Sequence, residues 1–165
     1  ERKEYYQNGY RHKVDGPALI EYNNEFILKK EYFLNGDLYR LDGPAKIIYY
    51  KNGNIERKEY YENDKKHRLD GPAEIWYYQN GNIEIEKYFQ NGIRHKEDGP
   101  AVIKYHTNGN IYFEKYFLNG KEILKEQLNK AGIDPYIYPF NKNDMMKIKL
   151  IFGWNKMKKY YYGNN

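Results

Sequence analysis

The chain has 165 residues, of which 40% are hydrophobic and 31% are charged, a length and mix that fit one or two small globular domains. It contains no cysteine and no serine, and Thr107 is its only threonine, which excludes disulfide bonds, thiolate metal sites and serine or cysteine nucleophiles. No apolar run approaches the ~20 residues of a membrane-spanning helix and no secretory leader is recognisable, so we expect an intracellular, cytoplasmic protein.

An internal repeat organises residues 1–120. The sequence Asp-Gly-Pro-Ala occurs four times at spacings of 27, 28 and 28 residues, beginning at Asp15, Asp42, Asp70 and Asp98. The dipeptide Asn-Gly or a close relative recurs with the same spacing from Asn8-Gly9 to Asn119-Gly120. It occurs at a further position of the unit as Asn52-Gly53, Asn80-Gly81 and Asn108-Gly109. We therefore predict about four 28-residue units, the first of them incomplete.

Each unit is expected to contain two β-hairpins. Asn-Gly between apolar runs is a strong hairpin signal because both residues tolerate the positive φ of a type I′ turn. The segments between the turns alternate and are rich in aromatic and β-branched residues, as in residues 73–78. We predict a mainly β protein, an elongated antiparallel meander of 28-residue β-hairpin repeats in a single-layer sheet. A closed barrel and a folded-over sandwich are the alternatives.

The charges test the strand register. A two-residue turn at Asn52-Gly53 places Lys46 opposite Glu59, and the same register one unit later places Glu74 opposite Lys87. Both charges swap sign together, as facing residues should. Around the other turn, the same rule gives four pairs, of which only the last joins like charges: Glu4 with Lys13, Glu31 with Arg40, Glu59 with Arg68 and Lys87 with Lys96.

The pattern changes after residue 120. One helical face over residues 121–131 carries Ile123, Leu124, Gln127 and Leu128, and Gly132 suits the C-cap. Two prolines then frame an aromatic linker, and Asn143 or Asp144 is expected to cap a second helix that ends at Phe152. We predict that residues 121–165 form a small α-helical cap over the open end of the array, followed by a basic tail.

The repeat resembles MORN-type repeat proteins, in the variant found in low-GC bacteria and giant DNA viruses. The resemblance is carried by Tyr60-Tyr61, His67-Arg68, Asp70-Gly71-Pro72-Ala73 and Asn80-Gly81 with their equivalents in the other units. The 28-residue unit is longer than the usual glycine-rich MORN unit. The resemblance implies scaffolding, self-association or contact with anionic lipid, without a catalytic residue. For a viral protein it implies a location in the host cytoplasm or the virion.

Two rows of repeated polar side chains invite chemical interpretation, namely the four aspartates of the Asp-Gly-Pro motifs and the row of His12, His67 and His95. Equivalent positions lie two strands apart, roughly 9 to 10 Å, which is too far to share one metal ion. A ladder of similar carboxylates also lacks the two different environments of an acid–base pair. The hairpin register packs each histidine against a facing tyrosine, such as Tyr60 with His67. We interpret both rows as structural and predict no catalytic, metal or cofactor site.

The tyrosines are the better candidates for binding, because a tyrosine offers a rigid apolar ring and a polar tip at low entropic cost. Ordinary packing within the sheet explains them equally well. The candidate protein-binding residues are Tyr49, Tyr50, Trp76, Tyr77, Tyr78 and Tyr105. We expect a non-enzymatic repeat scaffold that binds a protein partner or a second copy and takes no small-molecule substrate.

The charge is divided unevenly along the chain. Residues 1–120 hold 19 basic and 19 acidic residues, whereas residues 121–165 hold nine basic and four acidic ones. The repeats are therefore a poor surface for tracking phosphates. The alternative function is peripheral binding of an anionic membrane or nucleic acid through the aromatic, basic tail, although a solvated basic end is the simpler interpretation. The candidate anion-binding residues are Lys147, Lys149, Lys156, Lys158 and Lys159.

Overall fold

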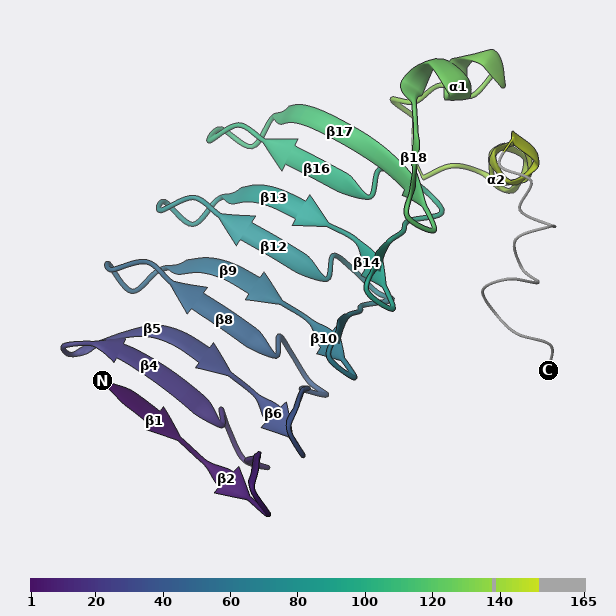
Figure 1. The fold of residues 1–165 in the computed structure, drawn as a ribbon. Coiled ribbons are helices and arrows are strands. Elements are labelled where there is room, and N and C mark those ends of the chain that lie inside the picture. The colour runs from purple at the N-terminus through teal and green to yellow at the C-terminus, as the bar shows by residue number, and fades with distance from the viewer. Residues whose placement is uncertain (138, 152–165) are drawn as a thin grey trace.

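The computed structural model describes residues 1–137 and 139–151. One open antiparallel sheet of ten strands dominates it, and two short helices, α1 (Lys125–Lys130) and α2 (Lys142–Ile151), lie at its C-terminal end (Figure 1). The predicted mainly β meander is confirmed, and the open strand order excludes the closed barrel. Among the described helices, none is long and apolar enough to span a membrane.

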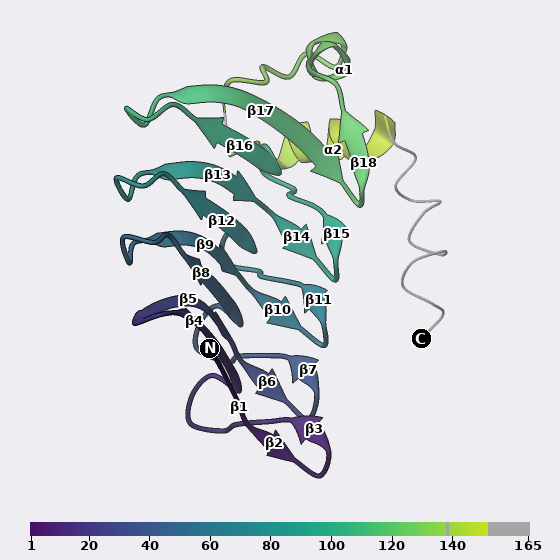
Figure 2. The same ribbon diagram turned by 60° about the vertical axis from the view of Figure 1, so that its left-hand side comes forward.

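Each unit contributes one long and one short hairpin. In spatial order, the ten strands of the large sheet are β1 (Arg2–Glu4), β4 (Leu19–Asn23), β5 (Phe26–Glu31), β8 (Lys46–Tyr49), β9 (Ile55–Glu59), β12 (Glu74–Tyr77), β13 (Ile83–Lys87), β16 (Val102–Tyr105), β17 (Ile111–Leu118) and β18 (Lys121–Ile123). The short hairpins are β2 (Tyr6–Gln7) with β3 (Tyr10–Arg11), β6 (Phe33–Leu34) with β7 (Asp37–Leu38), β10 (Tyr61–Glu62) with β11 (Lys65–Lys66), and β14 (Phe89–Gln90) with β15 (Ile93–Arg94). Figure 2 shows the short hairpins stacked along one side of the long ones.

The two hairpins of a unit turn differently. In the short hairpin, Asn8 and Gly9 have φ of 50° and 79°, as the predicted type I′ turn requires. The prediction of a two-residue turn at Asn52-Gly53 is wrong. Gly53 alone has positive φ, 85°, and its N–H donates to the carbonyl oxygen of Tyr50 at 2.9 Å. A β-bulge next to this wider turn restores the register, so Lys46 does lie opposite Glu59.

Residues beyond the short turns pair differently from the prediction. His12 donates its backbone N–H to Tyr5, but Glu4 then pairs with Leu19, and Lys13 bonds the next hairpin at Phe33. The chain exchanges partners here because it steps back into the large sheet through Asp-Gly-Pro. The four predicted pairs, Glu4 with Lys13, Glu31 with Arg40, Glu59 with Arg68 and Lys87 with Lys96, are therefore wrong.

The cations of those four pairs lie over tyrosine rings instead. The guanidinium of Arg68 lies 4.1 Å from the centroid of the Tyr60 ring. A Cβ on Gly71 would come within 3.1 Å of this guanidinium, so glycine leaves the space that the cation occupies. Equivalent contacts join Lys13 to Tyr5, Arg40 to Tyr32 and Lys96 to Tyr88. Cation–π contacts thus secure each short hairpin.

The C-terminal cap buries the largest apolar cluster: Tyr116, Leu118, Ile123, Leu128, Ile133, Phe140 and Ile148. The first predicted helix is too long, because residues 121–123 form β18 after a type I′ turn at Asn119-Gly120. The second helix begins two or three residues earlier than predicted. Asn141 caps it by accepting the N–H of Asp144 at 2.9 Å, and Phe152 lies outside the described residues.

Candidate functional site

The single-layer sheet has two different faces, because successive side chains of a strand point to opposite sides. The side that carries Glu31, Glu59 and Glu74 is here named the charged face. The other side, the tyrosine face, carries Tyr49, Tyr77 and Tyr105, each two residues after an isoleucine on the same face, namely Ile47, Ile75 and Ile103. The short hairpins supply basic residues to the charged face, as Arg11 shows by pairing with Glu4 at 2.7 Å.

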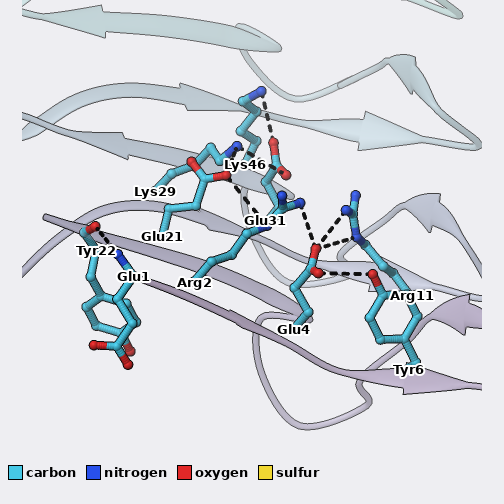
Figure 3. A network of polar contacts seen from close by, with 10 residues as sticks. All are labelled: Glu1, Arg2, Glu4, Tyr6, Arg11, Glu21, Tyr22, Lys29, Glu31 and Lys46. Carbon is cyan, nitrogen blue, oxygen red and sulfur yellow. Dashed lines mark hydrogen bonds and ion pairs between the residues drawn. The ribbon is translucent and has the colours of Figure 1, made fainter.

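A chain of ion pairs runs across the first two units on the charged face (Figure 3). Glu4 pairs with both Arg2 and Arg11 at 2.7 Å. The chain continues across the strands through Arg2 with Glu21 at 3.8 Å, Lys29 with Glu21 at 3.1 Å, Lys29 with Glu31 at 3.7 Å and Lys46 with Glu31 at 2.9 Å. Glu31 is only 7% exposed, so its ion pairs with Lys29 and Lys46 are largely shielded from solvent, whereas Arg2 at the edge of the sheet is exposed.

A second network of ion pairs on the charged face surrounds Glu74, which is 3% exposed. It accepts hydrogen bonds from Lys66, from Lys87 at 2.6 Å and from the indole N–H of Trp76 at 2.5 Å. Burial alone opposes ionisation, but these donors outweigh it and lower the pKa of Glu74 to about 2. Lys66 also pairs with Glu59 at 3.6 Å, so one ammonium separates two carboxylates that face each other across β9 and β12.

The candidate residue Trp76 belongs to this network. Its ring lies under the Arg57 guanidinium at 4.2 Å and the Lys87 ammonium at 5.5 Å. It therefore points away from the tyrosine face, and the structure separates it from its neighbour Tyr77.

On the tyrosine face, three candidate rings form a row. Lys30 lies 5.6 Å from the Tyr49 ring and Lys58 lies 5.3 Å from the Tyr77 ring. In the next unit the cation position holds Glu86 instead, and the Tyr105 hydroxyl donates to that carboxylate at 2.9 Å. All three tyrosines are half-buried, so each residue packs against the sheet and keeps part of its surface accessible to solvent.

Tyr50 and Tyr78 connect neighbouring units at the long turns. The Tyr50 hydroxyl donates to the carbonyl oxygen of Tyr77, and the Tyr78 hydroxyl donates to that of Tyr105, both at 2.7 Å. Both hydroxyls donate to carbonyl oxygens of the following unit, so holding neighbouring units together accounts for both residues.

The histidine row bonds the next short hairpin. The ring Nδ1 of His67 accepts the N–H of Asn91 at 3.1 Å. His12 and His95 make the same contact with Asn35 and Asn119. His95 is 5% exposed, and burial lowers its pKa. Tyr39 interrupts the row where the following turn is Asn63-Asp64, and there the Asp64 carboxylate accepts the N–H of Leu38 at 2.6 Å.

The four repeated aspartates, Asp15, Asp42, Asp70 and Asp98, are exposed loop residues. Asp70 accepts from Arg68 at 2.8 Å, and this bond lowers its pKa. Within residues 1–137 and 139–151, no group of three or more histidine, aspartate or glutamate side chains is placed to hold a metal ion.

Of the candidate anion-binding lysines, the structure describes two. Lys149 lies 3.4 Å from Glu97 in the fourth unit, and Lys147 lies 4.0 Å from Asp144 within α2. Lys156, Lys158 and Lys159 lie outside the described residues.

Comparison with models of protein families, with curated proteins and with solved structures finds no match for this chain. The arrangement of its side chains is therefore the basis for a functional proposal.

The buried ion network extends further than the sequence predicted. One signal of this network was present in the sequence: Lys46 faces Glu59, and one unit later Glu74 faces Lys87 with both charges reversed. The part played by the short hairpins, through Arg11 and Lys66, depends on how these hairpins fold toward the charged face, which no local pattern encodes.

Proposed function

We propose that this chain is a non-enzymatic, MORN-like repeat scaffold that acts inside a cell and binds a partner protein through the tyrosine face. The observation that carries the proposal is the row of half-buried tyrosines, Tyr49, Tyr77 and Tyr105, repeated at 28-residue spacing along one face of an extended sheet. Half-buried aromatic rings on a rigid sheet suit a binding surface, because little side-chain entropy is lost when a partner covers them.

Adjacent residues on opposite faces provide a sharp test. A photo-crosslinking phenylalanine analogue is placed at Tyr77 in one variant and at Trp76 in another, and each full-length protein is irradiated in native lysate. We expect specific protein adducts from position 77 and none from position 76, because Trp76 lies under Arg57 and Lys87 on the charged face. Adducts from position 76 alone, or from neither position, would contradict the proposal.

A second candidate function rests on the charge split between residues 1–120 and residues 121–165. Nine basic and four acidic residues with interleaved aromatic residues favour attraction of the tail to an anionic membrane or nucleic acid. Sedimentation with phosphatidylserine vesicles and a filter assay with RNA, each at 50 mM and 300 mM salt, test it. Binding through the tail should weaken with salt and disappear when residues 142–165 are removed, whereas binding through the tyrosine face should survive both changes.

A further inference from the structure

Two pockets of the same design lie between successive units, beside the Asp-Gly-Pro loops. One, of about 420 Å³, is lined by residues 39–43, by Tyr60 and by the loop that contains Arg68 and Asp70. The other, also of about 420 Å³, is formed by the equivalent residues one unit earlier, with Tyr32 in the place of Tyr60. The pocket thus recurs at two successive junctions between units, and both pockets lie at the opposite end of the strands from the long turns.

The equivalent junction at the C-terminal end of the array is filled by a segment of the chain itself. Asp98 and Tyr116 stand 56 residues after Asp42 and Tyr60 and are their equivalents. There the N–H of Phe140 donates to the carbonyl oxygen of Asp98 at 2.9 Å, and the Phe140 ring stacks on Tyr116 with centroids 5.7 Å apart. Both side chains are buried, with 7% of Phe140 and 1% of Tyr116 exposed. The segment between α1 and α2 therefore shows what an occupied junction holds.

The open junctions expose an aliphatic side chain at one repeated loop position. Val14, Leu41 and Leu69 are 77%, 80% and 77% exposed. In the fourth unit the equivalent residue is Glu97, and Lys149 of α2 pairs with it at 3.4 Å. A single exposed leucine needs no explanation, but three aliphatic residues at equivalent positions beside pockets form an apolar stripe. The stripe therefore favours a bound segment that carries an aliphatic residue at the position equivalent to Lys149 of α2.

The charges around the pocket between the second and third units are largely paired within the chain. The Arg68 guanidinium covers one side of the Tyr60 ring at 4.1 Å and donates to Asp70 at 2.8 Å. The Arg40 guanidinium lies over Tyr32 at 4.1 Å. Paired charges reduce the preference for an ionic ligand, and the Tyr60 ring favours stacking with an aromatic group.

We infer that the junction between the second and third units binds a short extended segment of a partner protein, which inserts an aromatic side chain between Tyr60 and the Asp42 loop. The backbone N–H of that aromatic residue donates to the carbonyl oxygen of Asp42, as Phe140 does to Asp98. A neighbouring aliphatic side chain covers Leu41 and Leu69. This surface is separate from the tyrosine face, so the inference does not depend on the proposed function.

The probe is a synthetic peptide of residues 133–150 in which Lys149 is replaced by leucine, added to the full-length ¹⁵N-labelled protein. We expect saturable shifts in the amide signals of Leu41, Tyr60 and Leu69, with a Kd below about 1 mM. A peptide that also carries Phe140→Ala should bind at least tenfold more weakly. The protein variant Leu41→Asp/Leu69→Asp should lose binding to the same degree, and because both side chains are exposed it should keep its fold.

Phe26→Asp is the matched protein control, since Phe26 is 57% exposed at a long turn far from the pocket, and it should bind the peptide normally. The absence of shifts up to 1 mM peptide would overturn the inference. Shifts confined to residues 116–148 would also overturn it, because the peptide would then only exchange with the chain's own segment. Dimerisation in sedimentation velocity that Leu41→Asp/Leu69→Asp abolishes would assign the surface to a second copy instead.

Discussion

Four alanines, one in each unit, lie with no exposed surface directly after Asp-Gly-Pro: Ala18, Ala45, Ala73 and Ala101. The carbonyl oxygen of Ala73 accepts the N–H of Tyr60 at 2.8 Å, where the chain passes from the large sheet to the short hairpin. Because the alanine side chain has no exposed surface, a longer side chain at this position would have to displace its neighbours.

Replacing Ala73 by leucine should lower the free energy of unfolding by about 1 to 3 kcal/mol, because extra methylenes in a packed site force shifts of side chain or backbone. Urea denaturation measures the effect. Gln79→Leu adds the same side chain at an exposed position of the same unit and should change stability by less than about 0.5 kcal/mol. Equal losses in the two variants would mean that the alanine is not a packing constraint.

The buried Glu74 carboxylate makes stability depend on pH. Its pKa is about 2 in the folded protein and 4.5 for the free group, so the unfolded chain binds the proton more readily. The stabilisation by the ionised carboxylate is complete above about pH 4.5 and is lost as the pH falls toward 2.

Glu74→Gln should therefore destabilise the protein by roughly 1 to 3 kcal/mol at pH 7, and this difference from the wild type should shrink between pH 4.5 and 2.5. Urea midpoints over that range measure it. Glu25→Gln, at an exposed turn position, should follow the wild type at every pH. A Glu74→Gln deficit that stays constant down to pH 2.5 would show that lost packing, not ionisation, is responsible.

Within the short hairpins, the histidine row explains why the units stack in register. His67 bonds the backbone N–H of Asn91 in the following type I′ turn, which would otherwise lack a partner at that end of the turn. The unit with Tyr39 in this position has lost both the histidine and the Asn-Gly turn that follows it, which supports their coupling.

His67→Ala should destabilise the short hairpin β14–β15 by about 1 kcal/mol, the usual contribution of one hydrogen bond. Hydrogen exchange should accelerate at Asn91 and Gly92 more than elsewhere. His106→Ala, which removes a histidine outside this row, should leave exchange at Asn91 unchanged. Uniform acceleration throughout the sheet in His67→Ala would argue against a local turn-stabilising role.

The sequence predicted the hairpins from local signals but not all of their pairings. Asn-Gly predicted the type I′ turns of the short hairpins correctly, but the same dipeptide forms a wider turn in the long hairpins. There the paired charges of Lys46 and Glu59 predicted the register. Glu4 and Lys13 were paired wrongly because the strand changes partner at Tyr5, and this exchange depends on the Asp-Gly-Pro step, a contact between distant segments.

At the scale of the whole molecule, the 28-residue period predicted an open sheet, because each unit can bury its apolar surface only against its neighbours. The inter-unit pockets could not be predicted this way. They depend on Arg40 and Arg68 lying over tyrosine rings, whereas cross-strand pairing assigned these cations to glutamates. The docking of Phe140 on Tyr116 likewise arises from a segment without periodicity.

An array of this kind should tolerate the removal of a whole unit. Deleting residues 16–42 joins Asp15 to Gly43 and restores an intact Asp-Gly-Pro-Ala sequence. In the shortened chain, β1 takes the place that β5 has beside β8. Glu4 then lies opposite Lys46 and forms the opposite-charge pair that Glu31 forms with Lys46 in the parent chain. In the shortened chain His12 also precedes the turn at Asn63 by 24 residues, the separation at which His67 bonds Asn91.

The shortened chain should keep its β-sheet circular dichroism per residue and melt cooperatively within about 10 °C of the parent, because only one unit and one junction are lost. Deleting residues 16–29, half a unit, is the control. It removes β4 and most of β5, leaves β1 without its partner and breaks the Asp-Gly-Pro step, so this chain should unfold or aggregate. If the whole-unit deletion behaves like the half-unit deletion, the units are not independent building blocks, and stability depends on cooperation along the entire sheet.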